Sequence, residues 1–138
     1  MEKLINLTEL MDGMATPNLS EPAYIIDKRL DGTYLIEVNS KILGDMNYEG
    51  IERTVEEALQ HDATMRFDLR NVVQVKDEFI ELLTKQVIEN YARSGSDWHD
   101  SRQRAANYFK QHVKAKVGRE MPRGLGAYKD VFEIVQEF

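Results

Sequence analysis

The fold is decided by residues 63–91, whose sequence is ATMRFDLRNVVQVKDEFIELLTKQVIENY. In the first part of this stretch, Met65, Phe67 and Leu69 alternate with charged residues, and a period of two predicts a strand buried on one face. The second part changes to the helical period, with Asp77 placed to cap the first turn. The apolar residues of the helical face are Phe79, Ile80, Leu83, Val87, Ile88 and Tyr91. The stretch therefore predicts a half-buried strand followed by an amphipathic helix.

Composition limits the class of protein. The chain has 138 residues, of which 42% are hydrophobic, so residues 1–138 are expected to form a single domain with one core. Cysteine is absent, which excludes disulfides, thiolate nucleophiles and thiolate metal sites. No apolar run approaches the roughly 20 residues that cross a bilayer, and the first ten residues lack the pattern of a signal peptide. We therefore expect a cytoplasmic protein that does not contact a membrane.

The residues before the deciding stretch predict an arm and a hairpin. Apolar residues at helical spacing predict a short amphipathic helix within residues 1–17, an N-terminal arm. The β-rich runs Tyr24–Leu30 and Thr33–Val38 are separated by Asp31 and Gly32, and this dipeptide between two such runs predicts a tight hairpin. The apolar residues of the arm are Leu4, Leu7, Leu10, Met11 and Met14.

A further helix is predicted from about Asn47 to Gln60, after a loop that contains Gly44. Its buried stripe consists of Tyr48, Ile51, Val55, Ala58 and Leu59. The order strand, strand, helix, strand, helix predicts an α+β fold. We expect a small mixed sheet, formed by the hairpin plus the central strand and covered by helices on one face. The sheet-and-helix core is assigned to residues 24–93, and residues 97–138 are expected to form a helical C-terminal half.

Residues 68–79, DLRNVVQVKDEF, resemble the centre of STAS domains, the sulfate-transporter and anti-sigma-factor-antagonist fold, and of their STAS-like relatives. That family typically has Asp-Leu-Ser-Gly-Val, a short apolar run, and then a Ser-rich turn that opens a helix. The residues that fit are Asp68, Leu69, Val72, Val75 and Phe79. The resemblance covers residues 24–93 and implies a domain that regulates a partner protein by binding it.

Two features depart from the STAS pattern. The family's phosphorylated serine is replaced by Asp77 and Glu78, so the phosphorylation switch is not transferred to this chain. Glu78 is interpreted either as a permanent phosphate mimic or as an acidic residue that stabilises the first turn of the helix. A STAS domain should also return to its sheet with a strand after this helix, whereas residues 98–117 have a helical pattern.

Charge is divided unevenly along the chain, whose net charge is −6. Residues 1–100 contain 10 Lys and Arg against 20 Asp and Glu, whereas residues 101–123 contain seven basic residues against Glu120 alone. A helix is predicted from Trp98 to Val117, followed by a basic loop over residues 118–126 and a last helix from Ala127 to Phe138. The apolar stripe of the first helix consists of Trp98, Arg102, Ala105, Ala106, Phe109, Val113 and Val117.

The basic segment, residues 102–123, supplies the candidate partner-binding residues. Basic residues with interleaved aromatics can bind acidic protein surface, on a partner or on the same chain, or nucleic-acid phosphates. The candidates are Arg102, Arg104, Tyr108, Lys110, Lys114, Lys116, Arg119 and Arg123.

Catalytic motifs are missing from the sequence. His61, His99 and His112 lack the spacing of a metal-ligand pair, and Gly124 and Gly126 lack the third glycine of the dinucleotide pattern. No catalytic residue, cofactor or metal is therefore expected. Three hypotheses follow: a non-enzymatic protein-interaction module, acting as a small regulator or inhibitor or by self-association; a nucleic-acid-associated accessory protein using residues 102–123; and a weakly marked enzyme with a site near His99.

Overall fold

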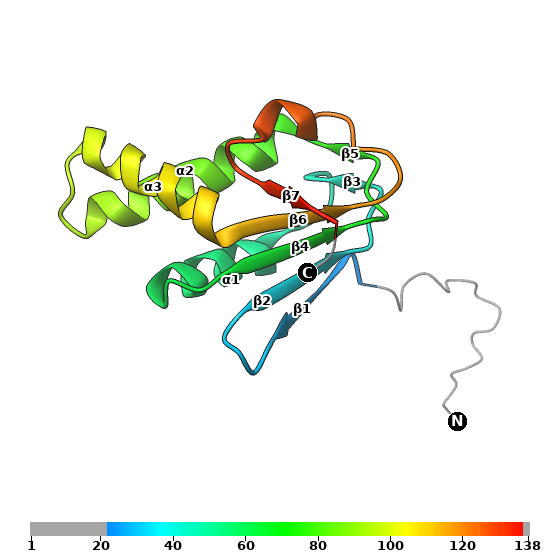
Figure 1. Ribbon diagram of the computed structural model, residues 1–138, viewed down its shortest axis with the longest axis horizontal. Helices are drawn as coiled ribbons and strands as arrows, with labels where there is room; N and C mark the ends of the chain where they lie inside the picture. The colour runs from blue at the N-terminus through cyan, green and yellow to red at the C-terminus, as the bar shows by residue number, and fades with distance from the viewer. Residues whose placement is uncertain (1–21, 137–138) are drawn as a thin grey trace, which may run out of the picture.

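The computed structural model describes residues 22–136, so the expected arm over residues 1–17 and the terminal Phe138 lie outside the described residues. The chain forms a mixed α/β fold (Figure 1). Its elements in order are β1 Tyr24–Lys28, β2 Tyr34–Val38, β3 Ile42–Leu43, α1 Glu49–Gln60, β4 Met65–Leu69, β5 Gln74–Val75, α2 Asp77–Arg93, α3 Trp98–His112, β6 Val113–Val117, the 3-10 turn η2 Leu125–Tyr128, and β7 Glu133–Val135.

The main sheet has five strands in the order β1-β2-β4-β6-β7. β1 is antiparallel to β2, and β2, β4, β6 and β7 are parallel to one another. A second, two-stranded parallel sheet joins β3 to β5 beyond the carboxyl ends of β2 and β4, at the right of Figure 1. The predicted hairpin and the predicted central strand are both confirmed.

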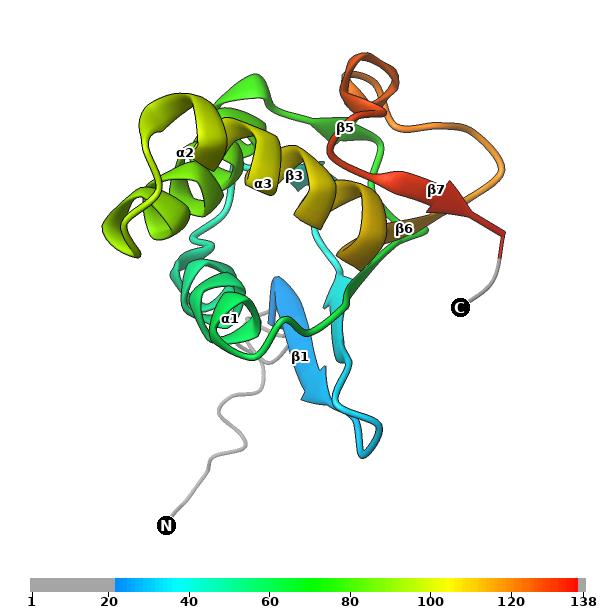
Figure 2. The same cartoon turned by 60° about the vertical axis from the view of Figure 1, so that its left-hand side comes forward.

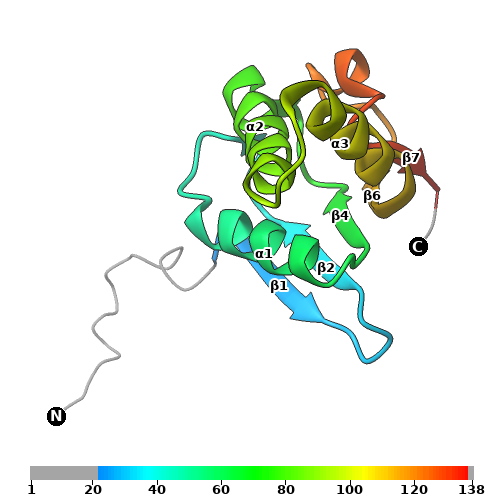
Figure 3. The ribbon, with the colours of Figure 1, turned by 90° about the vertical axis from the view of Figure 1, so that its left-hand side faces the viewer.

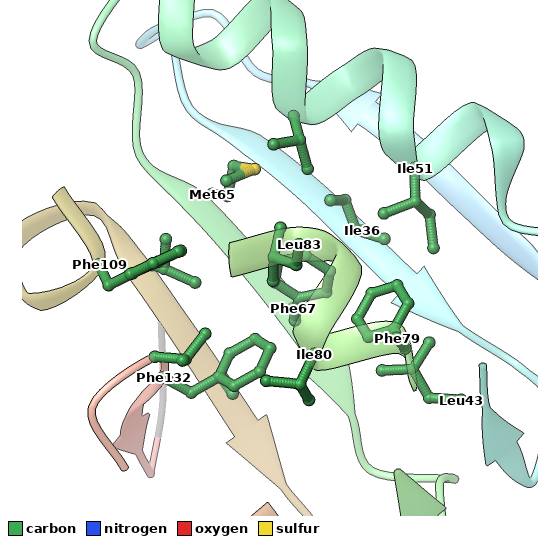
Figure 4. Packing of buried hydrophobic residues seen from close by; sticks show 14 of the residues in the cluster. Ile36, Leu43, Ile51, Met65, Phe67, Phe79, Ile80, Leu83, Phe109 and Phe132 are labelled. Atoms are coloured by element: carbon green, nitrogen blue, oxygen red, sulfur yellow. The ribbon is translucent and has the colours of Figure 1, made fainter. Parts of the chain in front are cut away.

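The helices cover one face of the main sheet, as predicted (Figure 3). α2 and α3 lie side by side as a helical hairpin, and α1 lies beside α2 (Figure 2). Phe67 on β4 is fully buried beneath them and meets the ring of Phe132 edge to face at a centroid separation of 5.3 Å (Figure 4). The alternation of β4 turns Arg66 and Asp68 to the opposite face, which no described helix covers.

The predicted helix from Trp98 to Val117 is correct only as far as His112. Residues 113–117 form β6, which pairs in parallel with both β4 and β7. Val113, Ala115 and Val117 alternate with two lysines, and this is a strand pattern. The prediction of a helix was wrong because Val113 and Val117 are four residues apart. This spacing places two residues on the same face of a helix and also on the same face of a strand. β6 returns the chain to the main sheet after α2 and α3.

The predicted last helix, Ala127–Phe138, is also wrong. The described part of this region contains the short turn η2 and the strand β7 instead. Val131 and Phe132 are buried, as the prediction required, but they lie in the connection between η2 and β7. The sheet supplies β7 with backbone partners on β6, and this tertiary pairing overrides a local helical pattern.

Three smaller expectations need correction. The turn of the hairpin is wider than two residues: Arg29 N–H donates to the carbonyl of Thr33, and Gly32 is the only turn residue with positive φ, at +89°. The expected loop after β2 contains β3, whose two residues are too few to show a period. Asp77 does not cap α2; its carboxylate accepts a hydrogen bond of 2.8 Å from the hydroxyl of Tyr128 instead.

Candidate interaction surface

The structure divides the predicted basic segment among three surfaces. Arg102, Arg104 and Lys110 lie exposed on α3. Lys114 and Lys116 lie on β6 and face the uncovered side of the sheet, whereas Arg119 and Arg123 lie in the loop that follows. The seven basic residues therefore form no single patch, since strand and helix direct them differently.

Tyr108 belongs to the core. Its side chain is only 3% exposed, and its hydroxyl donates a hydrogen bond of 2.7 Å to the carbonyl of Ala63. Burial raises the pKa of this hydroxyl far above its usual value of 10.0. The residue joins α3 to the loop before β4, and it is not placed to meet a partner.

The α2–α3 hairpin carries two separate pairs of an arginine and an aromatic residue. Trp98 is 58% exposed, and the guanidinium of Arg102 lies 5.9 Å from the centre of its ring. The guanidinium of Arg104 lies 4.8 Å from the ring of Tyr91. We call Tyr91, Trp98, Arg102 and Arg104 the α3 patch.

His99, the residue of the enzyme hypothesis, lies exposed in the first turn of α3. Its neighbour Asp97 is engaged as the cap of this helix, where its carboxylate accepts a hydrogen bond of 2.7 Å from the backbone of Asp100. Between residues 22 and 136, no group of three His, Cys, Asp or Glu residues is arranged to hold a metal ion. The carboxylate of Asp97 thus serves as a helix cap, two residues before His99.

On the uncovered face of the sheet, the lysines of β6 lie beside acidic residues. Lys114 forms an ion pair of 2.5 Å with Glu133 of β7. Lys116 is in register with Asp68 on β4, which is in register with Glu37 on β2. Acidic neighbours offset the positive charge of β6, so this face does not resemble a phosphate-binding stripe.

At the carboxyl ends of the parallel strands, three connections from distant parts of the sequence meet. The backbone N–H of Val73 donates to the carbonyl of Lys41 at 2.7 Å. The N–H of Arg123 donates to the carbonyl of Val73 at 2.9 Å, and Val75 donates back to the carbonyl of Arg123 at 2.8 Å. The three connections are therefore fixed to one another by backbone pairing, as in a small sheet.

Two glycines allow this close approach. Gly118 follows β6 next to Arg70, and a Cβ atom there would lie 2.8 Å from the carbonyl oxygen of Arg70. Gly124 has φ of +89°, and a Cβ atom there would collide with the carbonyl oxygen of Val75. Any side chain at either position would force the connections apart.

The exposed residues of these connections combine positive charge with apolar side chains. Val73 is 48% exposed and Met121 is 43% exposed, and they lie on connections that backbone hydrogen bonds hold together. The same connections carry the exposed basic residues Lys41, Arg70, Arg119 and Arg123 and the exposed acidic residue Glu120. We define the carboxyl-edge surface as Lys41, Arg70, Val73, Arg119, Met121 and Arg123.

The basic residues of the carboxyl-edge surface differ in how they are engaged. Arg70 is held by the carboxylate of Asp68, with two guanidinium hydrogen bonds of 2.9 and 2.8 Å, and these bonds raise the pKa of Arg70. Lys41, Arg119 and Arg123 form no ion pair with any residue from 22 to 136. Three positive charges of this surface therefore lack a carboxylate partner in the described part of the chain.

Sequence reasoning found two of these six residues, Arg119 and Arg123, and missed the other four. Lys41 belongs to the connection after β2, whereas Arg70 and Val73 belong to the connection after β4. These connections and the one after β6 become neighbours only because β2, β4 and β6 run parallel. These residues could have been identified by the rule that functional residues gather at the carboxyl ends of parallel strands. That rule could not be applied while β6 was interpreted as helix.

Comparisons with known proteins add no relative. No protein-family model matches the chain, and neither the curated proteins nor the solved structures contain a significant match. Over residues 22–136, no helix has the length and apolar character needed to span a membrane.

Proposed function

We propose that this protein is a non-enzymatic interaction module, a small regulator or inhibitor that acts by binding a partner protein through the carboxyl-edge surface. The observation that supports this function best is the exposure of Val73 and Met121 on loops fixed by backbone hydrogen bonds, together with three basic residues that form no ion pair within residues 22–136. Loops held by a rigid scaffold are the usual place for recognition, because their geometry is set before the partner arrives.

The composition of the surface indicates the class of partner. Arginine, methionine and aromatic residues are enriched in protein interfaces, and exposed apolar side chains ringed by polar ones mark such sites. Arg119 and Arg123 would pair with carboxylates of the partner, and Val73 and Met121 would meet apolar side chains. The partner surface is accordingly acidic and apolar.

A STAS-like identity of the fold is part of the same proposal. It is supported by the sequence pattern of residues 68–79 and by the added strand β6. The phosphorylation switch is not included in the proposal, because Asp77 and Glu78 replace the serine. The absence of cysteine fits a cytoplasmic location.

The test is affinity capture from the native cell followed by titration of the purified partner. We expect the double variant Arg119→Glu/Arg123→Glu to lose at least tenfold in affinity, about 1.4 kcal/mol. The matched control is Arg102→Glu/Lys110→Glu, which makes the same charge change on exposed positions of α3. Equal losses in the two double variants would contradict the assignment of the site.

A second candidate function, nucleic-acid association, is supported by the α3 patch. An exposed indole and guanidinium groups stacked on aromatic rings are the groups that bind single-stranded bases and phosphates. A gel-shift titration with single-stranded DNA and RNA at two salt concentrations tests it, because phosphate binding weakens as salt rises. Salt-sensitive binding that Trp98→Ala abolishes would establish this function in place of the first.

A further inference from the structure

We propose that the carboxyl-edge surface binds residues 1–21 of the same chain. This inference rests on the proposed use of that surface, and it identifies a ligand that would compete there with a partner protein. Residues 1–21 lie outside the described residues, so the argument uses their sequence, their point of attachment and the surface itself.

The point of attachment lies at the correct edge of the sheet. The backbone N–H of Asn39 donates to the carbonyl of Ala23 at 2.7 Å, and the Asn39 side chain donates to the carbonyl of Pro22 at 3.3 Å. Asn39 directly follows β2 and lies two residues before Lys41. Residues 1–21 are therefore attached at the carboxyl end of β2, where the carboxyl-edge surface begins.

The charges of the segment and the surface are opposite. Four carboxylates oppose one lysine in the segment, whereas three basic residues of the surface lack ion pairs within the described part of the chain. The acidic residues of the segment are Glu2, Glu9, Asp12 and Glu21, and its basic residue is Lys3. Opposite charge favours association and would orient the segment on the surface.

Both the segment and the carboxyl-edge surface also contain apolar residues. The segment contains three leucines and two methionines at helical spacing, and the surface exposes Val73 and Met121. Contact between these two sets would remove apolar area from water on both sides. An acidic segment with an apolar stripe thus has the chemistry inferred above for the partner protein.

The length of the connecting chain permits the contact. Residues 15–21 can extend to about 25 Å, whereas two strand spacings, from β2 to β6, amount to about 10 Å. A tether this short gives an effective concentration in the millimolar range. A segment with an intrinsic Kd of about 100 µM would then occupy the surface about nine-tenths of the time, and it would weaken partner binding about tenfold.

The absence of cysteine makes a direct test available. A nitroxide spin label attached to Thr8→Cys, in the otherwise native full chain, should broaden the amide signals of Val73, Met121 and Arg123. The amide signal of Leu30, at the hairpin tip on the opposite edge of the sheet, should remain sharp. The broadening should disappear in the labelled Arg119→Glu/Arg123→Glu variant, whose other signals report whether the fold is intact.

Three results would overturn the inference. The first is a lack of broadening at the carboxyl-edge surface, and the second is broadening that survives the charge reversal in a folded chain. The third is broadening in a mixture of labelled unenriched chains and unlabelled ¹⁵N-enriched chains, since this would place the segment on a second copy. The experiment contains no partner, so its failure is distinguishable from failure of the proposed function.

Discussion

Replacing Phe67 by alanine should remove the centre of the core. Phe67 is fully buried on β4, and its ring meets that of Phe132 edge to face at 5.3 Å. A buried Phe→Ala change costs about 3–5 kcal/mol, and the lost ring pair accounts for about 0.5–1.5 kcal/mol of this. Domains are typically stable by about 5–15 kcal/mol, so the variant should keep a fold of reduced stability.

Urea unfolding measures the effect of Phe67→Ala. With a slope of about 2 kcal/mol per molar, a loss of 4 kcal/mol lowers the midpoint by about 2 M. The matched control is Leu35→Ala on the uncovered face of β2, where the side chain is half-buried and the loss should be about 1 kcal/mol. A midpoint shift for Phe67→Ala no larger than that for Leu35→Ala would refute the assignment of the two faces.

Three further variants test other parts of the fold. Tyr108→Phe should lower the free energy of unfolding by about 1–2 kcal/mol in urea melts, because the partly buried carbonyl of Ala63 loses its donor; an unchanged melt would contradict its structural role. Gly124→Ala should cost at least about 1 kcal/mol, whereas Gly126→Ala, with open space around it, should cost less, and the reverse order in thermal melts would argue against the close approach. The pKa of Glu57 is lowered mainly by a hydrogen bond from Tyr34, so Glu57 stabilises the fold above the usual glutamate pKa and loses this effect as pH falls. Glu57→Gln should therefore be less stable than the native chain at pH 7 and approach it below about pH 4, and a constant difference would exclude the linkage.

The elements that could be predicted were those whose apolar residues are spaced in a way that fits only a helix or only a strand. The strand at Met65–Leu69 and the helices at Glu49–Gln60 and Asp77–Arg93 were all predicted, because their apolar spacing fits a single element. Residues 113–117 were misassigned because their valines fit both periods. The strand at Glu133–Val135 is stabilised by pairing with β6, and nothing in three residues indicates such a partner.

The candidate site was harder to predict than the fold. Counting charges along the sequence identified a basic segment. In the structure, the basic residues of this segment lie on a helix, a strand and a loop, and their side chains point in different directions. Lys41 and Val73 gave no signal, since backbone hydrogen bonds between distant connections bring them into the proposed site. Those contacts follow from the parallel order of β2, β4 and β6, which depends on recognising β6.

The most direct test of the central claim is a map of the partner's footprint on the chain. Amide signals of the ¹⁵N-enriched protein are followed while the captured partner is added. We predict that the largest shifts fall at Lys41, at residues 70–73 and at residues 118–123, and that Arg119→Glu/Arg123→Glu removes them. Shifts centred instead on Trp98 and Arg102, with the carboxyl-edge signals unchanged, would contradict the claim.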